Sequence, residues 1–471
     1  MIVLRKNQSE PIAKAKEFFA NKNSEPSLIV LPTAWGKSIL TAFVAKDITD
    51  KLLVLQPSKE LLEQNYKKYM SLCGDDFDTQ AGVYSASFGR KDVNKITYAT
   101  IGSIKNIGKL FKQLGFTRLL IDEAHLYPRG TESMFAKFLE DSEITHVLGI
   151  TATPIKLQSN TDMSGQRFSK LQMLTSRSAL GQKDRIARSF FKDIIHVSQV
   201  SEMVEMGFWS KLEYKATAFD GSQLVYNSSK SEFTEESMIQ VFGSNNTHAR
   251  IRQELDENQD RKHILVFVPS VAEARQFARE YPNSAAIYGD MDTNDRARII
   301  DDFRAGEIRV IFNVRVLSTG FDYTGLDCLI LGISTASIAL YYQILGRLTR
   351  IDPNKKDGLV IDLCGNVERF GRVEDIQFLR EGRMWKMYGS GGRLLSGVPI
   401  HEIGSVLKPT TENKSIENTA NFIPVSIMPF GKYKGEELNN IPVDYREWLI
   451  KSIDWHKGNL NLKLSIQQTL I

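Results

Sequence analysis

The chain has 471 residues, of which 42% are hydrophobic and 25% are charged, and its formal net charge at pH 7 is +4. This composition is that of a globular protein of two or three domains, and the small positive charge permits a polyanionic partner without requiring one. The sequence contains neither an apolar run of about 18 residues nor a secretory signal in residues 1–11, and its three cysteines are scattered without a CxxC pair. We therefore expect a cytoplasmic protein without a membrane span, disulfides or a zinc module.

Short apolar segments rich in β-branched residues alternate with amphipathic segments along most of the chain. The expected strands are 28–31, 52–55, 119–121 and 147–150 in the first half and 264–268, 309–312, 328–331 and 359–363 in the second half, and the clearest helices are 10–19 and 59–70. Continuous apolar strands between helices are typical of parallel sheets covered on both faces. The pattern predicts an α/β fold with two tandem domains, whose ligands bind at the carboxyl ends of the strands.

The first expected strand runs into a loop that ends Gly36-Lys37-Ser38, and the whole segment reads LIVLPTAWGKS. In a loop of this kind the backbone N–H groups cradle phosphate, the lysine meets the β- and γ-phosphates and the serine hydroxyl binds Mg²⁺. The residues expected to hold the nucleotide are Thr33, Ala34, Trp35, Gly36, Lys37 and Ser38.

This loop departs from the usual pattern at three positions. Leu31 and Ala34 stand where glycine is usual, and Trp35 is bulky for a loop whose backbone must approach phosphate. The alternative interpretation is an ordinary strand-to-helix turn that contains GKS by chance.

A second phosphate motif, LLIDEAH, occupies residues 119–125 at the end of another expected strand. Asp122 would hold Mg²⁺, and Glu123 would polarise the attacking water. The two motifs in this order predict hydrolysis of a nucleoside triphosphate.

The second half has no phosphate loop of its own but carries QILGRLTR at residues 343–350. We expect Arg347 and Arg350, three residues apart, to lie on one face of a helix. From there they could reach across a cleft and neutralise charge on a transferring phosphoryl group. A solvated basic helix face is the alternative.

With these motifs and several others in the family's order, residues 1–370 resemble the superfamily 2 helicases and translocases of the DEAH-box type. The run 343–371 is especially similar to bacterial RadD-type repair helicases and related phage enzymes, which suggests a bacterial or phage-infected cell. The other segments that match the family's motifs contain Arg5 and Gln8, Gln56 and Pro57, Thr100 and Ser103, His125, Thr151 and Thr153, Ser270, and Thr319, Gly320 and Asp322.

The resemblance implies two RecA-like domains, at 1–200 and 201–370, with ATP and Mg²⁺ in the cleft between them and nucleic acid across both. The implied catalytic residues are Lys37, Asp122, Glu123, Gln343, Arg347 and Arg350. Nucleotide contacts are also implied for Arg5, Gln8, Gly320 and Asp322, and coupling of the two sites for His125, Thr151 and Thr153. Nucleic-acid contacts are implied for Gln56, Pro57, Thr100, Ser103, Ser270 and Thr319.

Four segments lie outside these motifs. The polar stretch 158–193 is expected to be an insertion or a flexible surface loop, and 227–246 is expected to hold a helix. Residues 371–420 are expected to be a linker or extension, with linker-like composition at 389–393 and 408–418, and 421–471 a small accessory module. Aromatic and basic residues of that module either bind single strands or form the core of a small fold: Phe430, Lys432, Tyr433 and Lys434.

The leading hypothesis is an ATP-dependent DNA helicase or translocase acting in replication, recombination or repair. An RNA helicase is an alternative, because DNA and RNA helicases both bind the phosphate backbone and only contacts to the 2′-OH distinguish RNA from DNA. The altered phosphate loop favours another alternative, an ATP-switched nucleic-acid clamp or assembly subunit. The motor subunit of a restriction or defence complex is a further alternative, and protein partners stay open.

Overall fold

The computed structural model describes residues 4–73, 80–127, 133–161, 167–176, 190–228, 231–318, 321, 323–400, 403, 428, 433, 436–452 and 466. The chain divides into two compact units, Met1–Ser415 and Ile416–Ile471. The first unit contains two large sheets. We call residues 4–197 lobe 1 and residues 212–370 lobe 2.

The sheet of lobe 1 has eight strands in the order β10-β1-β7-β6-β2-β5-β3-β4. All neighbouring strands are parallel except β3 and β4. The strands are β1 (Ser27–Val30), β2 (Leu52–Gln56), β3 (Ala81–Ser85), β4 (Arg90–Lys91), β5 (Ile96–Thr100), β6 (Arg118–Ile121), β7 (His146–Thr151) and β10 (Asp193–Val197). The four strands expected in this half, β1, β2, β6 and β7, are confirmed and lie together in the middle of the sheet, where nearly every side chain is buried.

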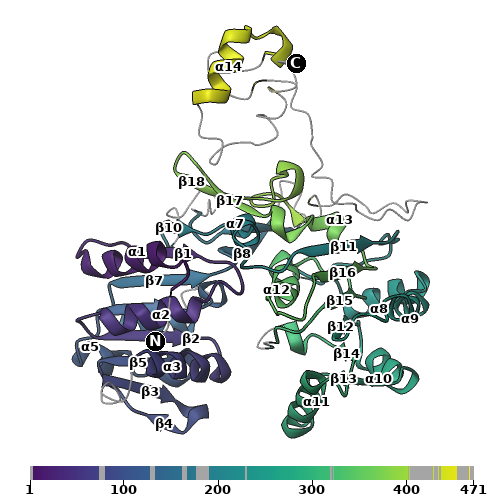
Figure 1. The fold of residues 1–471 in the computed structure, drawn as a ribbon. Coiled ribbons are helices and arrows are strands. Elements are labelled where there is room, and N and C mark those ends of the chain that lie inside the picture. The colour runs from purple at the N-terminus through teal and green to yellow at the C-terminus, as the bar shows by residue number, and fades with distance from the viewer. Residues whose placement is uncertain are drawn as a thin grey trace. The chain divides into compact units, whose positions relative to one another are not determined.

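The helices of lobe 1 are α1 (Ser9–Ala20), α2 (Lys37–Asp47), α3 (Lys59–Cys73), α4 (Ile101–Ile104), α5 (Gly108–Gln113) and α6 (Met134–Ser142). The first three pack side by side over the sheet (Figure 1). Buried residues of α1 recur at helical spacing, as Ile12, Ala15 and Phe19 illustrate, so this helix turns one apolar face to the sheet. The two helices expected from the sequence, α1 and α3, are confirmed.

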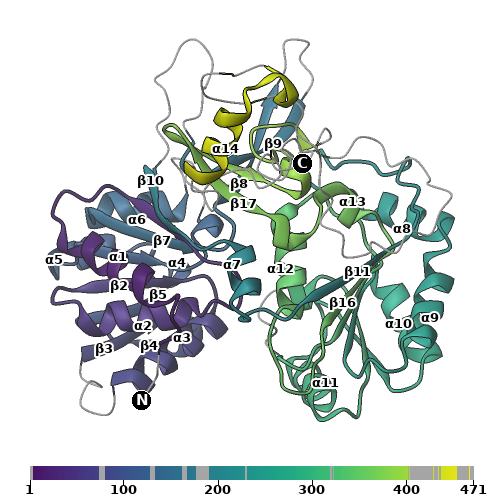
Figure 2. The same cartoon turned by 45° about the horizontal axis from the view of Figure 1, so that its top comes forward.

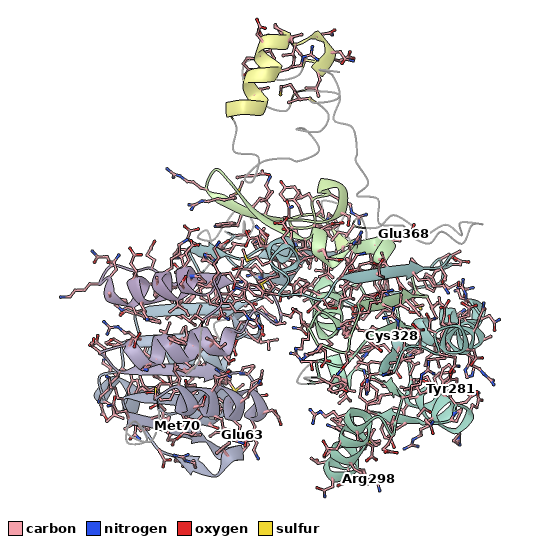
Figure 3. All side chains as sticks on the ribbon, viewed as in Figure 1. Glu63, Met70, Tyr281, Arg298, Cys328 and Glu368 are labelled. Carbon is pink, nitrogen blue, oxygen red and sulfur yellow. The ribbon has the colours of Figure 1, made fainter. Side chains whose placement is uncertain are left out.

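The sheet of lobe 2 has six strands, all parallel, in the order β11-β16-β15-β12-β14-β13. They are β11 (Leu212–Ala216), β12 (Ile264–Phe267), β13 (Ser284–Ile287), β14 (Val310–Asn313), β15 (Cys328–Leu331) and β16 (Gly358–Asp362). The four expected strands again form the centre. Cys328 is fully buried among them (Figure 3), which fits a packing role for this thiol.

The helices between β10 and the later hairpin at 377–388 are α7 (Val200–Glu205), α8 (Glu235–Ser244), α9 (Thr247–Glu257), α10 (Val271–Glu280), α11 (Thr293–Ala305), α12 (Ile338–Leu348) and α13 (Asn366–Phe370). Helices α8, α9 and α10 lie on one side of the second sheet and α12 on the other (Figures 1 and 2). The helix α8 confirms the one expected within 227–246. The α/β fold with two parallel sheets is thereby confirmed.

The polar stretch 158–193 is not simply a flexible loop. It begins within an antiparallel hairpin of β8 (Ile155–Thr161) and β9 (Arg167–Met173). Leu171 and Met173, two positions apart, are both buried, so one face of the hairpin packs against the protein.

The segment 389–393 is also not a linker, and this prediction was wrong. It follows a second hairpin, β17 (Gln377–Glu381) and β18 (Met384–Tyr388), and packs on the end of lobe 2. Ser390 Oγ donates to the Asp375 carboxylate at 2.7 Å, and Arg393 donates to the carbonyl of Arg369 at 2.7 Å. Its glycines serve a tight turn, because Gly391 has a φ of 67°. The other linker-like segment, 408–418, lies outside the described residues.

The second unit contains α14 (Val443–Ser452) and a small core that includes Leu438, Ile441 and Leu449. Tyr433 packs against this core, with its ring 4.8 Å from that of Tyr445. For Tyr433 the structure therefore favours the interpretation as part of a small fold. Phe430, Lys432 and Lys434 lie outside the described residues. Across the part of the chain that is described, no helix is long and apolar enough to cross a membrane.

Candidate nucleotide site

The loop between β1 and α2 places Lys37 at the start of a helix. Gly36 caps this helix with a φ of 96°, and Ala34 has a φ of 57°, so both residues have left-handed backbone. Glycine adopts this conformation freely, whereas alanine does so at a cost of about 1–2 kcal/mol. The loop thus has the backbone of a glycine-rich loop with alanine at one of its glycine positions.

Trp35 does not obstruct the loop, because its side chain is fully buried. The carbonyl of Trp35 accepts a hydrogen bond of 3.0 Å from Nε2 of Gln8, and Gln8 Oε1 accepts one of 3.0 Å from the backbone N–H of Arg5. The Arg5 guanidinium lies 4.9 Å from the centre of the Phe208 ring. Gln8, expected to contact nucleotide, therefore braces the phosphate loop directly, and Arg5 supports Gln8.

Lys37 and Glu123 form an ion pair across the carboxyl ends of β1 and β6. Burial lowers the pKa of Lys37, but the carboxylates of Glu123 and Asp122 outweigh it and hold this pKa above its ordinary value. For Glu123, burial raises the pKa and Lys37 outweighs it, so the pKa lies below its ordinary value. The ammonium and the carboxylate thus keep each other charged inside a poorly solvated site.

Asp122 is the third charged residue of this cluster and is only 5% exposed. Burial, followed by the neighbouring Glu123 carboxylate, raises its pKa to about 6. Its Oδ1 accepts the Glu123 N–H at 2.9 Å, and its Oδ2 accepts an N–H of Asn65 at 3.1 Å. A carboxylate accepts about four hydrogen bonds or metal contacts, so capacity remains for a cation.

Asn65 is a residue that the sequence analysis missed. It lies on the buried face of α3 together with Leu62 and Tyr69, and a polar side chain within such an apolar face was the available signal. Its amide also donates to Gln56 Oε1 at 2.8 Å. Gln56 is fully buried, so this conformation places it behind Asp122 and not on a surface open to nucleic acid, as had been expected from its motif.

His125 connects three parts of the site. Its Nδ1 lies 2.8 Å from the hydroxyl of Thr151 at the end of β7, and its Nε2 lies 3.4 Å from Nε2 of Gln343 on α12. Thr151 Oγ1 in turn accepts the N–H of Thr153 at 3.1 Å. Burial lowers the pKa of His125, which favours a neutral ring that donates with one nitrogen and accepts with the other. The three residues expected to couple the sites are therefore in contact.

Arg347 approaches the same cluster from lobe 2. Its charge lowers the pKa of both Lys37 and Glu123, so it acts electrostatically across the lobes. Its guanidinium donates to the carbonyl of Phe321 at 2.7 Å. Gly346, a further residue that sequence reasoning missed, packs so closely on Thr33 of the phosphate loop that any side chain at this position would overlap it.

Arg350 is not on the same helix face as Arg347, and this expectation was wrong. Helix α12 ends at Leu348, with Thr349 as its C-cap, so Arg350 follows the helix. The helix stops there because Thr349 Oγ1 donates to the carbonyl of Gly346 at 3.0 Å, and the Lys355 ammonium donates to the carbonyls of Leu348 and Arg350.

Four further expected site residues, Pro57, Thr100, Ser103 and Ser270, lie at or shortly after the carboxyl ends of strands. Thr100 Oγ1 and Ser103 Oγ are 3.0 Å apart at the end of β5, and Ser103 Oγ accepts the N–H of Ala86. Pro57 directly follows β2. Ser270 caps α10 by accepting the N–H of Glu273 at 3.2 Å. Ser38 lies in the first turn of α2, and Thr319, Gly320 and Asp322 lie outside the described residues.

Three family models match the chain. Residues 1–156 match "Type III restriction enzyme, res subunit", and residues 246–352 match "Helicase conserved C-terminal domain". Residues 419–470 match "Putative quorum-sensing-regulated virulence factor". The first two matches cover the phosphate loop with Asp122 and Glu123, and the helix that carries Gln343 and Arg347.

The curated relatives include helicases and translocases. The chain is 26% identical over 385 residues to "Putative mitochondrial ATP-dependent helicase irc3" of Schizosaccharomyces pombe, a match to 78% of this chain and 58% of that protein. It is 25% identical over 386 residues to "DNA 3'-5' translocase XPB2" of Sulfurisphaera tokodaii, covering 77% of this chain and 81% of that protein. The chain thus spans little more than half the length of the first of these relatives.

Among solved structures, the chain resembles "ATP-dependent Type ISP restriction-modification enzyme LlaBIII bound to DNA" with a TM-score of 0.53 and 16% identity, over 76% of this chain and 28% of that chain. At this identity the likeness concerns the fold alone. The two helicase family models, the relatives and the two parallel sheets agree: the chain belongs to superfamily 2 of the helicases, a family of nucleoside-triphosphate hydrolases that depend on ATP.

Proposed function

We propose that this chain is an ATP-driven DNA translocase or helicase whose hydrolytic site is shared by its two lobes. The observation that carries the proposal is the contact of His125 with Gln343, beside the ion pair of Lys37 and Glu123. Lobe 1 supplies the groups that bind phosphate, and lobe 2 supplies Arg347, whose charge already acts on them.

The ion pair of Lys37 and Glu123 makes nucleotide binding precede the activation of water. Within the ion pair, Lys37 lowers the pKa of Glu123 and makes this carboxylate a weak base. A γ-phosphate would attract the Lys37 ammonium away from Glu123, so the carboxylate becomes a better base for orienting a water. Arg347 would then stabilise the negative charge of the transferring phosphoryl group. Binding thereby prepares the residue that activates water.

The residues fit a Mg²⁺–ATP complex. Asp122 offers carboxylate oxygens with spare acceptor capacity, and Ser38 offers a hydroxyl at the start of α2, the oxygen donors that Mg²⁺ prefers. These two residues would hold the ion, which supplies positive charge next to the phosphates. The first turn of α2 has N–H groups without intrahelical partners, and Lys37 adds a positive charge there.

Movement would follow from the contacts between lobes. Gln343 of lobe 2 contacts His125, and His125 contacts Thr151. Hydrolysis at Glu123 can therefore change the position of lobe 2 relative to lobe 1 through these contacts. Thr100, Ser103, Ser270 and Thr319, which we propose hold phosphate oxygens of one strand, would then change their separation with each ATP. Contacts of that kind position a strand without reading its sequence.

DNA is proposed as the polymer because the relative from Sulfurisphaera tokodaii is named a DNA translocase and the structure of the similar restriction-modification enzyme is that of its complex with DNA. The test is ATP turnover by the purified chain with no polymer, single-stranded DNA, duplex DNA, branched DNA or RNA, beside Glu123→Gln as the control. Stimulation by DNA supports the proposal. Stimulation by RNA alone would reject the choice of DNA, and no turnover under any condition would reject hydrolysis.

A second candidate is the motor of a restriction or defence assembly. It is favoured by the match of residues 1–156 to the res subunit of type III restriction enzymes. Co-purification of partners with the tagged chain from its own cells tests this candidate. The candidate requires a stoichiometric protein partner, and it requires that this partner increase the DNA-stimulated ATP turnover.

A further inference from the structure

Two carbonyls of the phosphate loop are held by side-chain donors from outside the loop. Gln8 Nε2 donates to the carbonyl of Trp35 at 3.0 Å, and the indole Nε1 of Trp209 donates to the carbonyl of Thr33 at 2.9 Å. Gln8 belongs to lobe 1. Trp209 lies in the connecting segment 198–211, just before β11 begins lobe 2.

These two bonds orient the N–H groups that would face phosphate. A peptide group is planar and trans, so its carbonyl and its N–H point in opposite directions. Fixing the carbonyl of Thr33 on the Trp209 indole therefore fixes the N–H of Ala34, and Gln8 does the same for the N–H of Gly36. The left-handed backbone of Ala34, with a φ of 57°, needs such support because alanine does not favour it.

Trp209 is also tied to the helix that carries Arg347. The N–H of the next residue, Ser210, donates to the carbonyl of Thr349, the C-cap of α12, at 2.8 Å. Trp209 is 3% exposed, and its own N–H donates to the carbonyl of Met203 at 3.1 Å, which closes the turn after α7. Trp209 thus bonds to the phosphate loop, and the adjacent Ser210 bonds to the end of α12, the helix that carries Arg347.

We infer that Trp209 is a positioning residue that sets the phosphate loop according to the position of lobe 2. When lobe 2 and its helix α12 shift, Ser210 and Trp209 shift with them. The Thr33 carbonyl then loses or regains the hydrogen bond from the Trp209 indole. Nucleotide affinity then depends on lobe position through this bond. The inference rests on the proposed function, because it concerns how the same site communicates with the polymer.

The test compares three full-length variants. Trp209→Phe keeps an aromatic ring and removes the indole N–H. Gln8→Met removes the neighbouring donor, which belongs to lobe 1 alone. Trp385→Phe is the matched control, because that indole also donates within the protein, to Asp193 at 2.8 Å, but does not touch the loop.

Two quantities are measured for each protein: the affinity for a nonhydrolysable ATP analogue, and the factor by which this analogue changes the affinity for single-stranded DNA. Loss of one buried hydrogen bond should weaken analogue binding about fivefold to tenfold in both Trp209→Phe and Gln8→Met. Only Trp209→Phe should also move the coupling factor measurably toward one, while the contacts of Gln343 with His125 and of Gly346 with Thr33 remain. Trp385→Phe should match the wild type in both quantities, and melting temperatures confirm that each variant is folded.

A wild-type coupling factor in Trp209→Phe would overturn the inference, and so would an equal loss of coupling in Gln8→Met. If the wild-type protein binds the analogue but shows no coupling to DNA, or binds no analogue, the proposed function itself fails and this role fails with it. The two failures are distinguishable because measurements on the wild-type protein alone test the proposed function, whereas the variants test the role of Trp209.

Discussion

The two lobes have parallel sheets of the same kind but place different charges at the carboxyl ends of their strands. Lobe 1 holds Lys37 beside the carboxylates of Glu123 and Asp122, a cluster that contains charges of both signs. Lobe 2 contributes the guanidinium of Arg347, which donates to the backbone carbonyl of Phe321. This contrast fits the proposal that lobe 1 binds nucleotide through Lys37 and that turnover also needs the positive charge of Arg347 from lobe 2.

Lys37→Ala should have the largest effect, because it removes the countercharge of lobe 1 for phosphate. We expect ATP turnover to fall to background and analogue binding to be lost. Steady-state hydrolysis and equilibrium binding measure the two effects. Substantial turnover in this variant would show that lobe 1 does not bind the γ-phosphate through Lys37.

Arg347→Ala should separate turnover from binding. Its charge is needed when negative charge develops on the phosphoryl group, so turnover should fall roughly 10³-fold while analogue binding changes little. Arg298→Ala is the matched control, since Arg298 lies on α11 of the same lobe with its side chain 71% exposed (Figure 3). Near-normal hydrolysis by Arg347→Ala would contradict a site shared by the lobes.

A pH effect on stability should arise from a buried histidine of lobe 1. Burial lowers the pKa of His196 on β10 to about 4, and the nearby Glu10 carboxylate offsets this only in part. In the unfolded chain a histidine has a pKa of about 6.5, so between those values the unfolded state binds more protons and the folded state loses stability as pH falls.

We expect this histidine to cost about 2 kcal/mol of unfolding free energy between pH 8 and pH 5. Urea unfolding of the wild type and of His196→Gln at both pH values measures it. The variant should lose less stability at pH 5 than the wild type does. An equal loss in both proteins would show that another group is responsible.

The smallest expected effect concerns Ala34. Because Ala34 has left-handed backbone in the phosphate loop of lobe 1, Ala34→Gly should raise the unfolding free energy by up to about 1 kcal/mol with turnover retained. Asn246→Gly in lobe 2 is the comparison, since asparagine tolerates its φ of 51° and the gain there should be smaller. A loss of stability in Ala34→Gly would mean that the alanine methyl group has a packing role.

The sequence predicts the centre of each sheet better than its edges. The central strands β1, β7, β6 and β2, and likewise β16, β15, β12 and β14, are continuous apolar runs because both of their faces are covered. The outer strands were missed. The strand β13, for example, is the sequence SAAI, whose small residues give no apolar run, and β11 is the partly exposed sequence LEYKA.

The candidate site shows the same limit. Lys37, Asp122 and Glu123 follow directly from strands and local motifs, and the structure brings them together. The supporting contacts of Asn65 and Trp209 depend on tertiary packing, which local sequence does not encode. The predicted place of Arg350 on the helix is wrong because α12 ends at Leu348, where Lys355, seven residues further along the chain, donates to the carbonyl of Leu348.

The central claim is that Glu123 of lobe 1 and Arg347 of lobe 2 act on the same phosphoryl group. The most direct test is a double-mutant cycle on single-turnover ATP hydrolysis with Glu123→Gln, Arg347→Ala and the double variant. Groups that act as one unit are not additive, so the double variant should be about as slow as the slower single variant. If the two rate reductions multiply instead, the residues act independently and the shared site is contradicted.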